Sequence, residues 1–139
     1  MKLQDQLVNL ELSKQLKKCG YKQEGLWWWL PDSQKQYNLG TLKAKEGFKS
    51  LKWFADMVVY VAPTVAELGE ALSEKFYCYT VKDSGYSKAV KGEKGKIWLA
   101  KICDRNGGSR GNAICSFYAT NEANARAKMY IYLQKEGLI

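Results

Sequence analysis

Few residues of this sequence are of the types that carry catalysis, and histidine is absent. Without an imidazole, Ser-His-Asp catalysis, Cys-His catalysis and histidine metal triads are excluded. A site made only of carboxylates remains possible, because hard cations can be bound by oxygen ligands alone. The carboxylates open to such a site are Asp83, Asp104, Glu67 and Glu70, and nothing in their spacing selects one. We predict no catalytic residue, no metal ligand and no cofactor, hence a protein that is not an enzyme.

The cysteines offer little redox or metal chemistry. They are Cys19, Cys78, Cys103 and Cys115, so widely spaced that no C-x-x-C pair is formed. Three of them fall inside apolar, strand-like runs, as small buried thiols do. We expect reduced core cysteines, with disulfides as the alternative.

Two glycine-rich loops are candidate phosphate sites. Residues 92–96, GEKGK, lack the G-x-x-x-x-G-K-[ST] spacing, and Ile97 stands where a magnesium-binding hydroxyl is needed. Residues 104–112, DRNGGSRGN, can offer backbone amides, Arg105 and Arg110 to an anion. Such a composition also fills ordinary turns, so we favour a flexible hairpin loop there.

The chain is basic, with 22 Lys plus Arg against 14 Asp plus Glu, a net charge of +8 and a pI of about 9.3. This balance attracts polyanions. The only arginines are Arg105, Arg110 and Arg126, although the guanidinium is the group preferred for reading bases. The lysines are spread along the chain, which favours a solvating coat and leaves nucleic-acid binding as the alternative.

Length and composition favour one folded unit. A chain of 139 residues that is 46% hydrophobic fits a single domain over residues 1–139. The longest uncharged apolar run, residues 57–66, is too short to span a bilayer, and the amino terminus lacks the apolar block of a secretory signal. We expect a cytoplasmic protein with no membrane partner.

Hydrophobic periodicity predicts an α+β fold. We expect an antiparallel sheet of four to five strands with about three helices packed mainly on one face. The expected helices cover residues 10–19, 64–72 and 120–136, and the expected strands cover 25–30, 37–43, 57–61, 75–82, 96–103 and 113–119. The lysine-rich stretch 43–52 has no assigned element.

Capping residues fix the helix ends. Asn9 can cap the first helix and Gly20 can end it. Thr64 and Glu67 form a capping box, which explains Glu67 without a catalytic role. In the last helix a wide apolar arc leaves a narrow polar stripe of Asn124, Lys128 and Lys135, so we expect burial against a sheet and possible contact with a second chain.

Three adjacent indoles, in GLWWWLP at 25–31, raise the question of a stacking platform. In a strand Trp27 and Trp29 share one side, while Trp28 lies with Leu26 and Leu30. One continuous platform is therefore impossible. We expect one face to pack on helices, and the other to be covered by a partner or left partly wet at a sheet edge.

The residues also carry a resemblance. APTVAELGEAL at 62–72 and TNEANARAKMYIYLQKEGLI at 120–139 resemble a family of small phage, prophage and mobile-element proteins that end in a similar helix. ELSKQLKKCGYKQEGLWWWL at 11–30 is similar to that family's opening helix and aromatic strand. The resemblance implies a phage-related cytoplasmic protein and carries no activity, cofactor or catalytic residue.

Three functions remain open. The first is a non-catalytic binding or accessory protein that acts through protein contacts or self-association. The second is a nucleic-acid-binding module that uses dispersed lysines and aromatic stacking, and the third is a metal-dependent hydrolase. The residues expected to form a binding surface are Trp28, Tyr77, Tyr79, Arg105 and Arg110.

Overall fold

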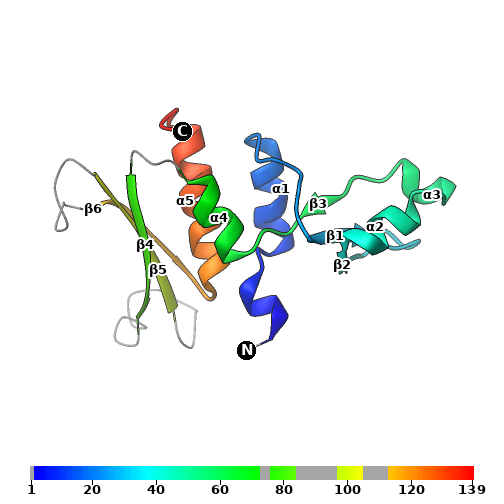
Figure 1. The fold of residues 1–139 in the computed structure, drawn as a ribbon, viewed down its shortest axis with the longest axis horizontal. Coiled ribbons are helices and arrows are strands. Elements are labelled where there is room, and N and C mark those ends of the chain that lie inside the picture. Colours follow the sequence, from blue (N-terminus) through cyan, green and yellow to red (C-terminus); the bar gives the residue numbers. More distant parts are fainter. Residues whose placement is uncertain (1, 73–75, 84–96, 105–112) are drawn as a thin grey trace.

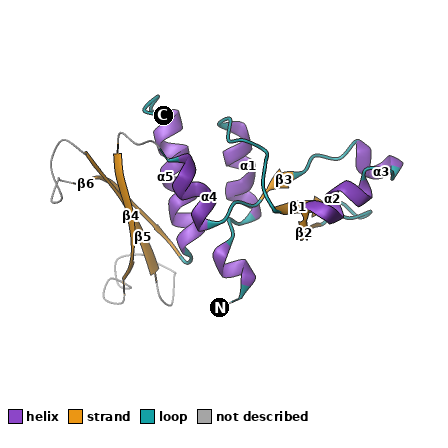
Figure 2. Cartoon of the chain, viewed as in Figure 1, coloured by secondary structure: helices purple, strands orange, loops and turns teal. Residues whose placement is uncertain are grey.

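The computed structural model describes residues 2–72, 76–83, 97–104 and 113–139, and it confirms the α+β class (Figures 1 and 2). A short 3-10 helix, η1, opens the chain. The elements in order are η1 (Leu3–Gln6), α1 (Leu10–Lys18), β1 (Trp27–Pro31), β2 (Tyr37–Thr41), α2 (Leu42–Phe48), α3 (Lys52–Ala55), β3 (Tyr60–Val61), α4 (Val65–Ala71), β4 (Phe76–Asp83), β5 (Ile97–Asp104), β6 (Ala113–Ala119) and α5 (Glu122–Lys135).

In the described residues the strands form two antiparallel sheets of three strands each, ordered β2-β1-β3 and β4-β5-β6. The prediction of a single sheet of four to five strands is therefore wrong. β1 already has a neighbour on each side, and β3 pairs over two residues only before Pro63, which has no amide hydrogen to continue a ladder. Helices α1, α4 and α5 lie between the two sheets (Figure 1).

The first sheet is covered on both faces, where the sequence predicted helices mainly on one. Helix α1 lies over one face, with Lys14 against Tyr37 and Lys17 against Tyr60. Helix α2 lies over the other face, with the Lys45 Nζ atom 3.5 Å from the centroid of the Trp28 ring. Five α-helices are present in the described residues. The lysine-rich stretch 43–52, which received no assignment, forms most of α2 and the first residue of α3.

Helix caps follow the sequence closely. The Leu12 amide donates to Asn9 Oδ1 at 2.9 Å, and Gly20 follows α1 with a φ of +89°. At α4 the Thr64 amide donates to Glu67 Oε2 at 2.7 Å, and the Glu67 amide donates to Thr64 Oγ1 at 3.2 Å. The predicted caps and capping box are therefore confirmed.

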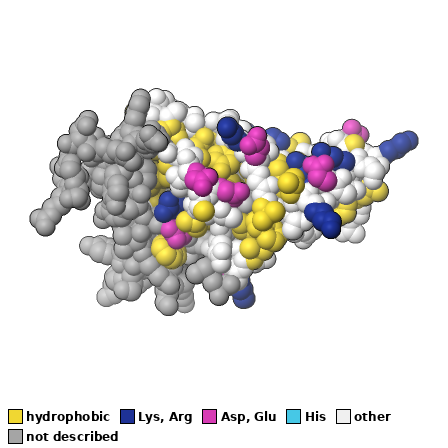
Figure 3. Space-filling view, in the orientation of Figure 1, with side chains coloured by type: hydrophobic (Ala, Val, Ile, Leu, Met, Phe, Trp, Pro, Cys, Tyr) yellow, Lys and Arg dark blue, Asp and Glu magenta, His cyan; other side chains and the backbone are white. Residues whose placement is uncertain are grey.

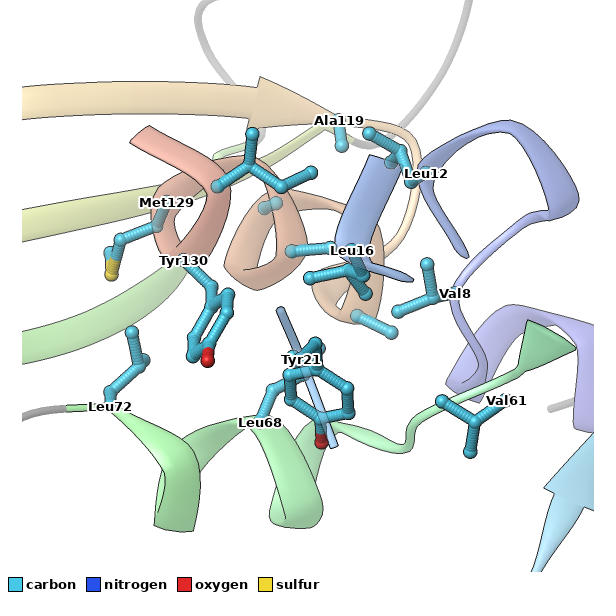
Figure 4. Packing of buried hydrophobic residues seen from close by; sticks show 14 of the residues in the cluster. Val8, Leu12, Leu16, Tyr21, Val61, Leu68, Leu72, Ala119, Met129 and Tyr130 are labelled. Carbon is cyan, nitrogen blue, oxygen red and sulfur yellow. The ribbon is translucent and has the colours of Figure 1, made fainter. Parts of the chain in front are cut away.

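One hydrophobic cluster connects the elements. It extends from Trp28 in β1 through Leu16 in α1 and Leu68 in α4 to Ala100 in β5. Figure 4 shows Leu16, Leu68 and Tyr130 converging between the helices. No helix in the described part of the chain is long and apolar enough to cross a bilayer.

The polar stripe predicted for the last helix is wrong at Asn124, which is buried. Its side chain is only 6% exposed, and its Oδ1 accepts a hydrogen bond of 2.9 Å from the Asn9 amide. A buried amide is tolerated where its hydrogen bonds are made inside the protein. Asn124 therefore belongs to the contact between α5 and the start of α1.

Candidate functional site

Of the five residues predicted as a binding surface, only Trp28 has a described side chain. Trp28 is 2% exposed, and its Nε1 donates to the Gly25 carbonyl at 2.9 Å. The Lys45 Nζ atom of α2 lies over its ring, so Trp28 offers little open surface for stacking and fits the interior role expected for the indoles. Tyr77 and Tyr79 lie in β4, but their side chains, and the whole of Arg105 and Arg110, lie outside the described residues.

The metal and thiol candidates are described only in part, since the side chains of Asp83 and Asp104 lie outside the described residues. Among the described residues, no group of three His, Cys, Asp or Glu side chains is placed to hold a metal ion. Cys19 is a free thiol in an intermediate environment, and burial raises its pKa. A raised pKa keeps the thiol protonated, which makes it a poor nucleophile. The side chains of Cys78, Cys103 and Cys115 lie outside the described residues.

Three adjoining pockets follow the outer side of α1, and we call them together the α1 groove. The first, about 510 Å³, lies between α1 and the residues leading into β3. The second, about 400 Å³, lies where the carboxyl ends of α1 and α5 meet. The third, about 270 Å³, lies between α1, α5 and β6. Gln15 lines all three pockets.

The α1 groove is strongly basic. The charged side chains that line it are Lys14, Lys17, Lys18, Lys128, Lys135 and Glu11. Five cations against one anion create a positive potential that attracts polyanions. The rings of Tyr60, Phe117 and Tyr132 also line the groove, and each is half-buried.

Several of these lysines are held in place by the fold. The Lys17 Nζ atom lies 5.3 Å from the centroid of the Tyr60 ring and donates to the Val59 carbonyl at 3.1 Å. The Lys128 Nζ atom donates to the Tyr118 carbonyl at 2.6 Å. Lys18 and Lys135 are exposed and face the second pocket. The groove therefore combines fixed charges with charges that reach into solvent.

A second surface lies at the far end of the molecule, where α2 and α3 project from the first sheet (Figure 1). Every residue from 46 to 53 is exposed, including Phe48, Leu51 and Trp53. Lysine side chains lie beside hydrophobic ones at this end in the space-filling view (Figure 3). We call residues 42–55 the α2–α3 tip.

A further hollow, about 360 Å³, has an acidic lining. It is lined by Tyr21, Lys22, Glu24, Glu67, Glu70, Ala71 and Tyr130. The Glu67 carboxylate is already used in the capping box, and the Tyr21 and Tyr130 rings pack edge to face at 5.1 Å. The hollow is therefore explained by helix capping and ring packing.

The sequence contained part of the signal for the α1 groove. Lys14, Lys17 and Lys18 occupy the polar side of the first helix, and Lys128 and Lys135 lie in the polar stripe predicted for the last. What periodicity does not tell is that the two polar sides face one pocket. That requires the packing of α1 against α5.

Comparison of the chain with protein-family models, with curated proteins and with solved structures gave no match. The resemblance to phage and mobile-element proteins therefore stays a prediction.

Proposed function

We propose that this protein is a non-catalytic nucleic-acid-binding protein that holds a single strand in the α1 groove. The observation that carries the proposal is the composition of the groove, in which five lysines and one glutamate line three pockets that share Gln15, together with three half-buried rings. Proteins that bind single strands combine a positive groove for the backbone with rings for the bases. No step of covalent chemistry is needed.

The groove favours a single strand over a duplex. Bases in a duplex are stacked on one another, so the rings of Phe117 and Tyr132 find free base faces only on a single strand. Among the described residues that line the groove, all cations are lysines, which contact phosphates as point charges and do not read base edges by a fork. We therefore propose binding with little sequence preference.

Protein contact or self-association, the first expectation from the sequence, ranks second. Each copy carries a net charge of +8, and two lysine-lined grooves repel one another. An acidic protein is an alternative ligand for the same charges, but the rings in the groove favour bases.

The test is fluorescence anisotropy with a labelled oligothymidine over a range of salt concentrations. We expect binding at low salt that weakens steeply as salt rises. A plot of the logarithm of the affinity against the logarithm of the salt concentration should have a slope of about −0.7 for each phosphate contact. The double variant Lys18→Ala/Lys135→Ala removes two contacts. It should lower both the affinity and the magnitude of the salt slope, the slope by about 1.4.

The matched control is Lys43→Ala/Lys52→Ala, which removes the same charge from the α2–α3 tip and should leave the salt slope near that of the unmodified protein. A duplex of the same length tests the preference for single strands. The proposal fails if no oligonucleotide binds at low salt, or if the groove variant and the tip variant weaken binding equally.

A further inference from the structure

The α2–α3 tip exposes apolar side chains that the fold leaves uncovered. Phe48 is 41% exposed, Leu51 38% and Trp53 43%. Only Phe54 in this segment is buried, at 5%, and the rings of Phe48 and Trp53 pack against it at 5.5 Å and 5.9 Å. The tip is therefore an ordered cluster of rings on a single buried anchor.

Basic side chains surround these rings. Lys43, Lys49 and Lys52 are exposed beside them, while the acids of the segment and the turn after it are Glu46 and Asp56. Glu46 pairs with Lys49 at 2.7 Å, and hydrogen bonding from Lys49 lowers the pKa of the Glu46 carboxyl. The exposed surface of the tip thus has a positive balance carried by Lys43 and Lys52.

Part of the backbone in and after the turn between the helices is hydrogen-bonded internally. The Leu51 amide donates to the Phe48 carbonyl at 3.0 Å, the Phe54 and Ala55 amides donate to the Leu51 carbonyl at 3.1 Å, and the Met57 amide donates to the Phe54 carbonyl at 3.0 Å. Unpaired backbone groups oppose entry into an apolar medium. A turn with these bonds made can enter the edge of a bilayer at lower cost.

We propose that the α2–α3 tip docks on an anionic lipid surface, with Phe48, Leu51 and Trp53 at the level of the headgroups and Lys43 and Lys52 facing the lipid phosphates. Aromatic and leucine side chains flanked by lysine are the composition of interfacial anchors. This contact is peripheral and involves no spanning helix.

The small extent of the tip favours lipid over a second protein. A stable protein interface needs about 800 Å² and about 20 to 30 residues on each side. The tip offers residues 42–55 at one end of an elongated molecule (Figure 1). Its lysines also oppose association with a second copy through the same face. A protruding end with few residues suits a fluid surface that can close around it.

The experiment is sedimentation of the full chain with vesicles of neutral phosphatidylcholine or of phosphatidylcholine mixed with phosphatidylglycerol. We expect binding to the mixed vesicles, little binding to the neutral ones, and weakening with salt. Phe48→Ser/Trp53→Ser should reduce the partition coefficient by about tenfold. Lys43→Ala/Lys52→Ala should reduce it by about fivefold for each lysine removed.

Two controls separate this surface from the α1 groove and from misfolding. Leu138→Ser removes an apolar side chain of similar exposure, 38%, near the carboxyl terminus and should bind vesicles normally. Lys18→Ala/Lys135→Ala should lower oligonucleotide binding more than vesicle binding. Quenching of tryptophan fluorescence by brominated lipid in the unmodified protein tests contact directly, and Trp53→Phe should abolish most of it.

The outcomes distinguish the occupants. Equal binding to neutral and anionic vesicles, or unchanged binding by both tip variants, overturns the proposal. If vesicles do not bind and the mass rises with concentration unless Phe48 and Trp53 are replaced, the tip is a self-association surface and the proposal is wrong. If those replacements weaken oligonucleotide binding and leave vesicle binding intact, the tip serves nucleic acid and the lipid proposal is wrong.

Discussion

At the scale of single residues, Ser13 is a polar group in an apolar place. It lies on the buried side of α1 at 0% exposure, and its Oγ atom has no hydrogen-bond partner among the described residues. A hydroxyl buried without a partner costs about 1 kcal/mol or more. The small side chain is tolerated because it fits where α1 packs closely against its neighbours.

Replacement of Ser13 by alanine should therefore stabilise the protein. We expect Ser13→Ala to raise the free energy of unfolding by about 1 kcal/mol, because it removes the unpaired hydroxyl and improves helix propensity. Urea denaturation measures the change. Ser50→Ala, at an exposed position, is the control and should change it by less than about 0.5 kcal/mol. A destabilised Ser13→Ala would show that the hydroxyl is bonded.

Tyr21 should make the stability of the protein depend on pH in the alkaline range. Burial, together with the nearby Glu67 carboxylate, raises the pKa of Tyr21 from 10.0 to about 12. The folded state thus favours the neutral phenol, so this contribution is full below pH 10 and is lost as pH rises toward 12. Over that window the loss approaches about 2 to 3 kcal/mol. Tyr21→Phe should lose less stability than the unmodified protein between these pH values in urea melts, and identical losses would contradict the assignment.

The lysine–ring contacts explain how the tryptophan strand is accommodated. The Lys45 Nζ atom lies over the Trp28 ring, and burial, with a smaller effect of the Lys49 charge, lowers the pKa of Lys45. The Trp29 Nε1 donates to the Val8 carbonyl at 3.0 Å. Trp28 and Trp29 therefore each have a local partner, and helices cover both faces of the strand. The interior role expected for Trp28 holds, while a ligand platform there does not.

At the scale of elements, three asparagines join the amino-terminal segment to α5. Asn121 caps α5 by accepting from the Asn124 amide at 2.7 Å, and its Nδ2 donates to the Leu7 carbonyl at 3.2 Å. Asn124 in turn accepts from the amide of Asn9, which caps α1. The caps of the first and last helices are thus linked by hydrogen bonds. This junction sets the relative position of α1 and α5, and with it the width of the α1 groove.

Loss of the Asn124 side chain should loosen that junction. Asn124→Ala leaves the Asn9 amide without its acceptor in a part-buried position, so we expect a loss of about 1 to 3 kcal/mol in the free energy of unfolding. Asn38→Ala, at an exposed position in β2, is the control and should change it little. If Asn124→Ala is as stable as the control, a water molecule or another group replaces the bond.

At the scale of the whole molecule, a shared core predicts that both sheets unfold together. Leu16 is 0% exposed in the cluster that connects β1 with β5. We expect Leu16→Ala to lower the free energy of unfolding by about 2 to 5 kcal/mol and to raise amide exchange in both β1 and β5. Hydrogen-exchange mass spectrometry measures each strand separately. Faster exchange in β1 alone would mean that the sheets unfold independently and that the chain is two folding units.

The positive charge is arranged on two surfaces and not only as a uniform coat. The α1 groove and the α2–α3 tip are made by different elements, and α1 and α2 lie on opposite faces of the first sheet. The two proposed ligands therefore engage different lysines. This is why each pair of lysine variants serves as the control for the other.

By itself the sequence determined the local features. The caps at Asn9 and Thr64, the hairpin that contains the three tryptophans, the later strands and the final helix all follow from turn formers, capping side chains and apolar periodicity. These features depend on interactions within a few residues, which a sequence displays directly. The strand predicted at 57–61 is too long. Its length is set by pairing with β1, which involves only Tyr60 and Val61.

The tertiary structure alone decided how these pieces meet. It divided the strands between two sheets, buried Asn124, covered Trp28 with α2 and brought the lysines of α1 and α5 to one groove. Each of these outcomes depends on contacts between segments far apart in the chain, and periodicity shows which side of a helix is polar without showing what that side faces.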